Sequence, residues 1–148
     1  MSKPAEGRVS ALWLNKGSRK PLQPVDVAAL IPGKGAAGDR HARADRQRRS
    51  VLVMDEETLS ALELAPGDVR EQITTAGIDI YSLRPGDRIA FGNQAVLQIT
   101  MECEPCERMD ELKDGLQEAI RGRRGMLAFV ERGGRITVGD PVRIARSE

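Results

Sequence analysis

The sequence predicts a mainly β fold, a closed or partly open β-barrel with two or three short helices. Three observations lead to this fold class. The 15 glycines and 8 prolines fall between short apolar stretches, as in a protein with many turns. Eight of those stretches have the length and composition of strands, and only two segments show helical spacing. No linker or repeat divides the 148 residues, so we expect a single domain over 1–148.

The clearest strand prediction is residues 94–101, where apolar side chains alternate with other residues. Ala95, Leu97, Ile99 and Met101 are expected on one face, which is buried, and Thr100 and its even-numbered neighbours on the other. The other predicted strands are shorter and are bounded by turn residues. They cover residues 8–14, 25–31, 50–54, 88–91, 126–131, 135–138 and 142–145.

Two segments are predicted to be short amphipathic helices that cover open ends of the sheet. Residues 55–64 begin with Asp55 as an N-cap and an acidic first turn, and Pro66 follows. In residues 107–121, the apolar side chains of Met109, Leu112, Leu116 and Ile120 recur at helical spacing.

The composition excludes partners that are recognised by bulk charge. Lys and Arg number 23 against 22 Asp and Glu, which gives a net charge of +1. Only four aromatic residues are present, too few for a nucleic-acid stacking platform. No apolar run approaches the length of a membrane span, and residues 1–7 lack the apolar core of a signal peptide. We therefore expect a soluble, cytoplasmic protein that binds neither nucleic acid nor membranes.

The only two thiols, Cys103 and Cys106, stand together between the clearest strand and the second predicted helix. A C-x-x-C pair in a cytoplasmic protein can be a redox couple, half of a zinc site, or a ligand for a soft metal. A closed zinc site needs about four ligands, and the chain has no second such pair and a single His. Three neighbouring glutamates disfavour a thiolate, and two partly buried structural cysteines would also fit the pattern.

A glycine-rich and arginine-rich loop is the second candidate site. Glycines let the backbone approach a ligand closely, and Arg recognises phosphate or carboxylate through two hydrogen bonds. The loop lacks the spacing of a Walker A motif. A solvated loop in a protein that prefers Arg to Lys is the alternative interpretation. The segment runs from Gly33 to Arg43 and is followed by Arg46, Arg48 and Arg49. Its candidate residues for anion binding are Gly38, Asp39, Arg40, His41, Arg43 and Arg49.

A third segment, residues 69–79, carries long polar side chains within a short β-like stretch. Arg70 and Gln72 could line a polar ligand pocket, and Glu71 lies between them. A solvent-facing edge strand would have a similar composition.

Taken in order, these segments resemble the MOSC domain, the C-terminal domain of molybdenum-cofactor sulfurases that also occurs in small stand-alone bacterial proteins. The resemblance covers residues 7–144. It rests on Gly-Asp-Arg-His at 38–41, Arg-Glu-Gln-Ile-Thr-Thr-Ala-Gly-Ile-Asp at 70–79, Leu-Arg-Pro-Gly-Asp at 83–87, Cys-Glu-Pro-Cys at 103–106, Arg-Gly-Met at 124–126 and Gly-Gly-Arg-Ile-Thr-Val-Gly-Asp at 133–140.

The resemblance implies a β-barrel with small helices, similar to the PK β-barrel, and a binding site for the molybdenum cofactor. It implies that Cys106 is the protein ligand to molybdenum, as in relatives that reduce N-hydroxylated compounds. A soft thiolate suits a sulfur-rich molybdenum centre. Cys103 and His41 are further catalytic candidates. The arginine-rich loop would then bind the phosphate and pterin together with Arg70, Glu71 and Gln72, although the family motif has Glu-Asn where this chain has Glu71-Gln72.

Three functions follow as hypotheses. The first is a molybdenum-dependent oxidoreductase that receives electrons from a partner protein and acts as a monomer or homodimer. The second is a carrier that holds sulfur as a persulfide on Cys106 or Cys103, or hands the cofactor to a client enzyme. Its sulfur would come from a separate cysteine desulfurase that depends on pyridoxal phosphate. The third is an interaction domain without a cofactor.

Overall fold

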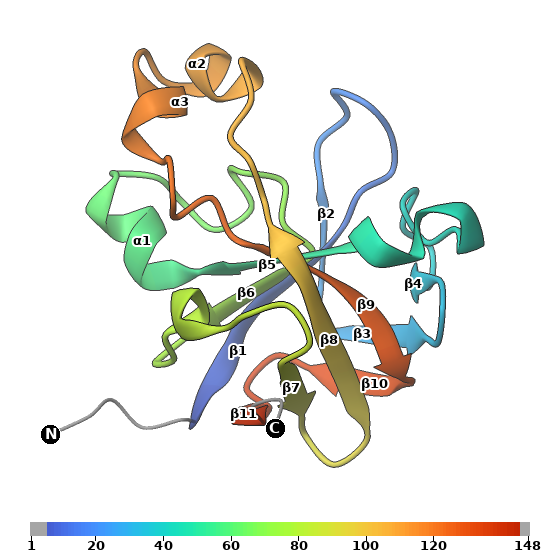
Figure 1. Ribbon diagram of the computed structural model, residues 1–148. Coiled ribbons are helices and arrows are strands. Elements are labelled where there is room, and N and C mark those ends of the chain that lie inside the picture. The colour runs from blue at the N-terminus through green and yellow to red at the C-terminus, as the bar shows by residue number, and fades with distance from the viewer. Residues whose placement is uncertain (1–5, 146–148) are drawn as a thin grey trace, which may run out of the picture.

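In the computed structural model, which describes residues 6–145, seven strands close into a barrel (Figure 1). Strand β1 closes it, because β1 pairs with β6 on one side and with β11 on the other. Neighbouring strands are antiparallel except β5 and β6, which are parallel. The predicted barrel is confirmed. In their order around the barrel the strands are β1 (Glu6–Leu14), β6 (Ile73–Ala76), β5 (Val51–Asp55), β9 (Met126–Arg132), β8 (Ala95–Glu102), β7 (Arg88–Phe91) and β11 (Pro141–Ala145).

Four further strands lie outside this ring or extend it. Strand β2 (Gln23–Val25) pairs with the second half of β1, and β10 (Gly134–Thr137), β3 (Val27–Ile31) and β4 (Gly35–Ala36) form a small separate sheet. The predicted strand 25–31 is therefore two strands that part at Asp26, one joining each sheet. The side chains inside the barrel form one apolar core, with Phe91, Leu97 and Val51 fully buried.

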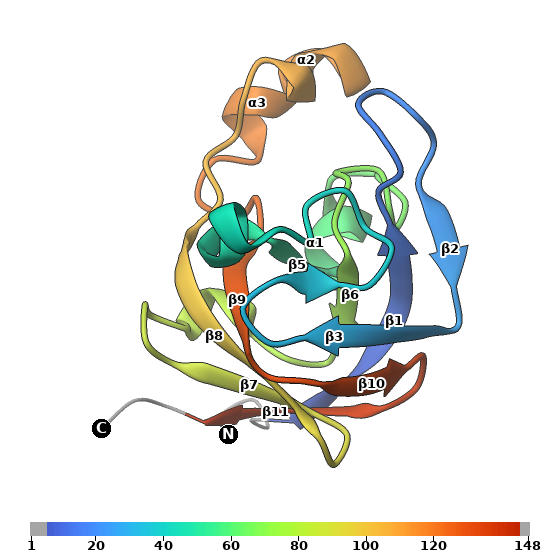
Figure 2. The ribbon, with the colours of Figure 1, turned by 90° about the vertical axis from the view of Figure 1, so that its right-hand side faces the viewer.

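Short helices gather at one end of the barrel, where they cover a second apolar cluster (Figures 1 and 2). They are α1 (Glu56–Ala61), α2 (Arg108–Leu112) and α3 (Leu116–Ala119), with the 3₁₀ helices η1 (Ala44–Arg49) and η2 (Ile80–Ser82) elsewhere on the barrel. Asp55 caps α1 as predicted, since its carboxylate accepts a hydrogen bond from Thr58 N at 3.0 Å. None of the described helices is long and apolar enough to cross a membrane.

The prediction of one helix over residues 107–121 is wrong, because the segment forms two short helices, α2 and α3. Lys113 is extended and Gly115 has φ +78°, so the chain breaks between α2 and α3. The break changes which apolar residues are covered: Met109, Leu116 and Ile120 are buried as the helical spacing predicts, but Leu112 is 42% exposed.

Strand β8 follows its predicted alternation only as far as Ile99. A β-bulge between Ile99 and Met101 reverses the faces, so Thr100 is buried and Met101 is half-buried. The hydroxyl of Thr100 lies 2.5 Å from the carbonyl oxygen of Arg48. The bulge therefore ties η1, and the arginines it carries, to the barrel wall.

Strand β6 lies within residues 69–79, which the sequence marked only as β-like, and it is a paired strand of the barrel wall rather than the solvent-facing edge strand offered as the alternative. It pairs with β1 and with β5, and all four of its side chains are buried. Two of them are Thr74 and Thr75, whose hydroxyls reach Glu71 and the carbonyl oxygen of Met54. Because this strand contains threonines and is flanked by charged residues, its sequence does not indicate that both of its faces are buried.

Gly125 offers a test of how the chain enters β9. It has φ +101°, and a Cβ there would lie 2.7 Å from Val53 O and 2.9 Å from Leu52 Cδ1. Gly125→Ala should therefore destabilise the protein by more than the roughly 1–2 kcal/mol that a left-handed backbone alone costs. Gly115→Ala is the matched control, because its φ is +78° and nothing lies within 4 Å of the added methyl. Urea unfolding that gives equal losses for the two variants would contradict this packing.

Candidate functional site: an arginine-lined pocket with two cysteines

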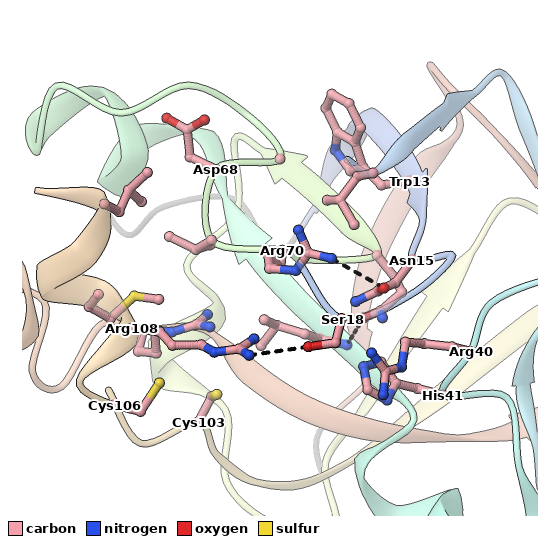
Figure 3. A pocket seen from close by; sticks show the side chains of 18 of the residues that line it. Trp13, Asn15, Ser18, Arg40, His41, Asp68, Arg70, Cys103, Cys106 and Arg108 are labelled. Atoms are coloured by element: carbon pink, nitrogen blue, oxygen red, sulfur yellow. Dashed lines mark hydrogen bonds between the residues drawn. The ribbon is translucent and has the colours of Figure 1, made fainter. Parts of the chain in front are cut away.

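A pocket of about 930 Å³ opens at the helical end of the barrel (Figure 3). It is built where several strands begin or end: β1 ends at its rim, β5 and β6 begin there, and the loops after β8 and before β9 complete it. The volume falls within the range of about 300–1,000 Å³ that is usual for small-molecule sites.

Positive charge dominates the lining of the pocket. Asp68 and Glu111 are the only acidic residues among the lining residues, and Glu111 is already paired with Arg19 at 2.8 Å. Such an excess of guanidinium groups is the arrangement expected for an anionic ligand. The lining arginines are Arg19, Arg40, Arg46, Arg49, Arg70, Arg108 and Arg124.

Both predicted cysteines line the pocket, on the loop between β8 and α2 (Figure 3). The N–H of Cys103 donates to Gly125 O at 2.9 Å, which fixes the loop against the start of β9. The two thiols differ in exposure, with Cys103 half-buried and Cys106 exposed. Burial raises the pKa of the Cys103 thiol, and the nearby charges of Arg124 and Arg49 oppose that rise. Cys103 is therefore a neutral thiol near pH 7.

The glycine-rich loop contributes Arg40 and His41 to the pocket, whereas Asp39 serves to hold the loop in place. The buried Asp39 carboxylate accepts hydrogen bonds from Asn15 N at 2.6 Å and His41 N at 2.9 Å. Gly38 has φ +88° and its carbonyl oxygen accepts a hydrogen bond from the ammonium of Lys16 at 2.9 Å. These contacts join the loop to the end of β1, so Gly38 and Asp39 shape the site without lining it.

His41 lies in the pocket half-buried among cations. Burial lowers its pKa most, and the charge of Arg46 lowers it further; Asp39 opposes this with a smaller effect than that of Arg46, and Arg40 adds a smaller lowering still. The imidazole is therefore neutral near pH 7 and can accept a hydrogen bond or a proton.

Arg49 and Arg43, two other residues of the arginine-rich segment, lie in different places. Arg49 lines the pocket from η1. Arg43 does not line it, because its guanidinium pairs with the Asp45 carboxylate at 2.6 and 2.9 Å on the exposed surface. The segment thus supplies both a pocket wall and a solvated surface, the two interpretations that its sequence left open.

Arg70 faces the pocket from a left-handed backbone conformation, with φ +65°. Its guanidinium donates to Asn15 Oδ1 at 3.2 Å and to Gly17 O at 3.0 Å, which anchors the loop between β1 and β2 (Figure 3). Burial and the charges of Arg108 and Arg40 lower its pKa, a sign of how crowded the cations are.

Of the two residues after Arg70, Gln72 lines the pocket and Glu71 does not. Gln72 Oε1 accepts a hydrogen bond from Leu52 N at 2.7 Å, and its amide nitrogen lies 3.4 Å from the Asp39 carboxylate. Glu71 is fully buried, with Oε2 accepting hydrogen bonds from Gly67 N and the Thr74 hydroxyl, both at 2.8 Å. Glu71 therefore orders the loop of residues 65–70 from inside the protein.

Sequence reasoning did not assign a role to several lining residues, notably Asn15, Ser18, Arg108 and Arg124. Ser18 and Arg108 are 90 positions apart in the chain and meet at 3.2 Å across the pocket (Figure 3). Only the barrel brings them together, so no local pattern could have shown it. Arg124 could have been noticed, because it precedes Gly125 in a motif that the sequence shares with a known family.

Arg124 differs from the other lining arginines because it is nearly inaccessible, at 8% exposure. Its Nε and Nη1 atoms are buried and have no hydrogen-bond partner among the described residues. Buried guanidinium groups are normally paired, since an unpaired buried charge is costly. Arg124 is thus an unsatisfied cation in the wall of the pocket.

The structure is a small β-barrel whose end holds an arginine-lined pocket with a C-x-x-C loop. Residues 39–143 match the family model for the MOSC domain, and the chain belongs to the MOSC family. No curated protein matches the chain in a sequence comparison.

Solved structures have the same fold at low sequence identity. The YuaD protein from Bacillus subtilis is 20% identical with a TM-score of 0.81, covering 97% of both chains. YiiM from Geobacillus stearothermophilus is 18% identical with a TM-score of 0.75, over 95% of this chain and 75% of its own. YiiM from Escherichia coli is 19% identical with a TM-score of 0.69, over 95% of this chain and 71% of its own.

The buried Glu71 predicts a pH dependence of stability. Burial raises the pKa of this carboxyl, so the folded protein binds the proton more tightly than the unfolded chain does. Ionising Glu71 therefore destabilises the folded state as the pH rises above the unfolded pKa of about 4.3. Glu71→Gln keeps an oxygen acceptor for Gly67 and Thr74 but cannot ionise. The stability of this variant relative to the wild type should rise with pH.

Urea unfolding of both proteins from pH 4 to pH 8 would measure the difference. Glu104→Gln, which makes the same change at an exposed site, is the control. If the difference in unfolding free energy between Glu71→Gln and the wild type stays constant across this range, the pKa of Glu71 is not raised in the folded protein.

Proposed function

We propose that this protein binds the molybdenum cofactor in the arginine-lined pocket and is a small molybdoenzyme. The observation that carries the proposal is the meeting of a guanidinium-rich pocket with two free thiols at its wall. The cofactor has an anionic phosphate end and a sulfur-bound metal end, and the lining offers a partner for each. Membership of the MOSC family supports the same assignment.

The residues of the pocket fit such a ligand on physical grounds. The unpaired guanidinium of Arg124 is a buried cation that an anionic ligand would neutralise. Arg40 stands across the pocket from the cysteines in Figure 3, and Arg70 also lines the pocket, so forked donors are present that suit a phosphate and a polar pterin. Cys106, exposed at the pocket, would be the thiolate ligand to the metal.

When bound, the cofactor would supply a metal centre that passes two electrons from a partner protein to an N-hydroxylated compound. The overall reaction converts R–NHOH, two electrons and two protons into R–NH2 and water. The chain itself would bind the cofactor through its arginines, and His41 could accept a proton from solvent and release it in the pocket, because its imidazole is neutral near pH 7.

Metal content tests the proposal directly. Full-length protein produced in a host that makes the cofactor should contain molybdenum, and Cys106→Ala should lose most of it, measured by elemental analysis of the purified protein. Arg43→Gln is the matched control, since Arg43 is paired with Asp45 outside the pocket and its loss should leave the metal content unchanged. Equal molybdenum in the wild type and Cys106→Ala would refute the assignment of the ligand.

The exposure of Cys106 also favours a second candidate function, a sulfur carrier. An exposed cysteine side chain can enter the active site of a partner, here a cysteine desulfurase that depends on pyridoxal phosphate. The Cys106 sulfur would attack the outer sulfur of the partner's persulfide. The S–S bond of the donor breaks, its thiolate leaves, and Cys106 keeps the transferred sulfur as a persulfide.

Mass spectrometry distinguishes this carrier from the molybdoenzyme. After incubation with a cysteine desulfurase and free cysteine, the carrier should gain the mass of one sulfur atom on the peptide with Cys106. The half-buried Cys103 should gain less, and Cys106→Ala should remove the added mass. Absence of added sulfur on the wild-type protein would rule the carrier function out.

A further inference from the structure

We propose that the loop of residues 15–22, between β1 and β2, and helix α2 form a clasp across the pocket that opens to admit a ligand. Two contacts close the clasp, an ion pair between Arg19 and Glu111 and a hydrogen bond between Arg108 and Ser18. The clasp controls access to the pocket, so this inference goes beyond the proposed function and applies to any ligand that the pocket binds.

The tip of the loop reaches α2 at the end of the barrel where the pocket opens (Figure 2). The guanidinium of Arg19 donates to the Glu111 carboxylate at 2.8 and 3.4 Å, and the guanidinium of Arg108 donates to the Ser18 hydroxyl at 3.2 Å. All four residues line the pocket. The partners are 92 and 90 positions apart in the chain, so the two contacts connect separate walls of the pocket.

The base of this loop is fixed, and only its tip depends on the clasp. Asn15 Oδ1 and Gly17 O accept hydrogen bonds from the guanidinium of Arg70, at 3.2 and 3.0 Å. At the tip, the side chains of Ser18 and Arg19 have no hydrogen bond or ion pair within residues 6–145 except those with α2. Breaking these two contacts therefore frees the tip while the base keeps its place.

The backbone at the tip adopts a conformation that depends on a compensating contact. Lys20 N donates to Gly17 O at 3.2 Å and closes a four-residue turn, in which Arg19 is the third residue and has φ +59°. A positive φ at this position suits glycine and is uncommon for other residues. The ion pair of Arg19 with Glu111 supplies a contact that favours this conformation when the clasp is closed.

The contacts of the clasp are also weak enough to open. The side chains of Arg19 and Glu111 are 63% and 52% exposed, and solvent and salt screen an ion pair at such a site. The opposite side of the clasp is held more firmly, because Met109 of α2 is buried in the second apolar cluster. The tip of the loop is therefore the part that moves when the clasp opens.

The experiment compares how fast a large and a small reagent reach Cys103, which is half-buried in the pocket. Full-length protein without the cofactor is treated with N-pyrenylmaleimide or with iodoacetamide, both uncharged, so that a change in pocket charge does not steer them. Tandem mass spectrometry assigns the label to Cys103 or to the exposed Cys106. Arg19→Gln and Glu111→Gln should each speed the reaction of the large reagent with Cys103 several-fold, and change the iodoacetamide reaction and the labelling of Cys106 much less.

A charge reversal tests whether the ion pair itself closes the clasp. Arg19→Glu and Glu111→Arg should each open the pocket to the large reagent, because each places like charges opposite one another. The double variant restores opposite charges and should return the rate at Cys103 toward that of the wild type. Arg88→Gln is the matched control and should leave the rate unchanged, because Arg88 forms an exposed ion pair with Glu131 at 2.8 Å and does not line the pocket.

The proposal is overturned if Arg19→Gln and Glu111→Gln leave the rate of the large reagent at Cys103 equal to that of the wild type. It is also overturned if the double charge reversal is as open as either single variant.

Amide hydrogen exchange provides an independent readout of the same opening. Residues 17–20 should exchange faster in Arg19→Gln than in the wild type, because the hydrogen bond from Lys20 N to Gly17 O is lost when the tip moves. High salt should reduce the difference, since it screens the ion pair of the wild type. Equal exchange in the two proteins at low salt would contradict the clasp. Neither readout uses molybdenum, so the clasp and the proposed function can fail separately.

Discussion

The antiparallel pairing of β1 with β11 is the contact on which the rest of the structure depends, because it closes the barrel. Closure sets β1, β5, β6, β8 and β9 side by side at fixed registers, so the loops at one end converge on a common space. The pocket residues come from segments as far apart as Trp13 and Leu127. None of these segments is long enough to form a site alone. The site is therefore a property of the closed sheet rather than of any motif.

Closure of the barrel also brings the arginines of the pocket close together. Carboxylates offset their mutual repulsion at some positions and not at others. Asp39 and Glu71 are buried carboxylates that bind backbone and side-chain groups around the pocket, and Glu111 pairs with Arg19 at the rim. An exposed pair such as that at the rim stabilises little, because solvent screens it. The deep cation, Arg124, has no such pair. The unfavourable electrostatic energy that remains is greatest at Arg124, where solvent screens charge least. An anionic ligand would therefore interact most strongly with the protein there.

The sequence predicted the barrel because turn residues and alternation are local signals, and eight predicted strands fall on observed ones. It marked the segment of β6 only as β-like, because the threonines of this strand satisfy their hydroxyls within the protein, and it did not show the bulge that buries Thr100. For the site, residue types were enough to select Arg40, His41 and the cysteines, all of which line the pocket. They were not enough to separate Arg49 from Arg43, because the separating fact is the pairing of Arg43 with Asp45. Position relative to a neighbour, rather than residue type, decides such cases.

The two sides of the pocket differ in chemistry, and this difference constrains any ligand. Arg40 and His41 lie on one side in Figure 3, and Cys103 and Cys106 lie across from them. A simple polyanion would contact the first side and make no use of the thiols. A thiophilic metal ion alone would have two cysteines as ligands, because the described residues contain no group of three or more metal-binding side chains. A ligand that carries its own metal ligands and an anionic tail can use both sides at once. This arrangement supports the proposal of a composite cofactor, rather than a bare metal ion or a bare phosphate, as the ligand of the pocket.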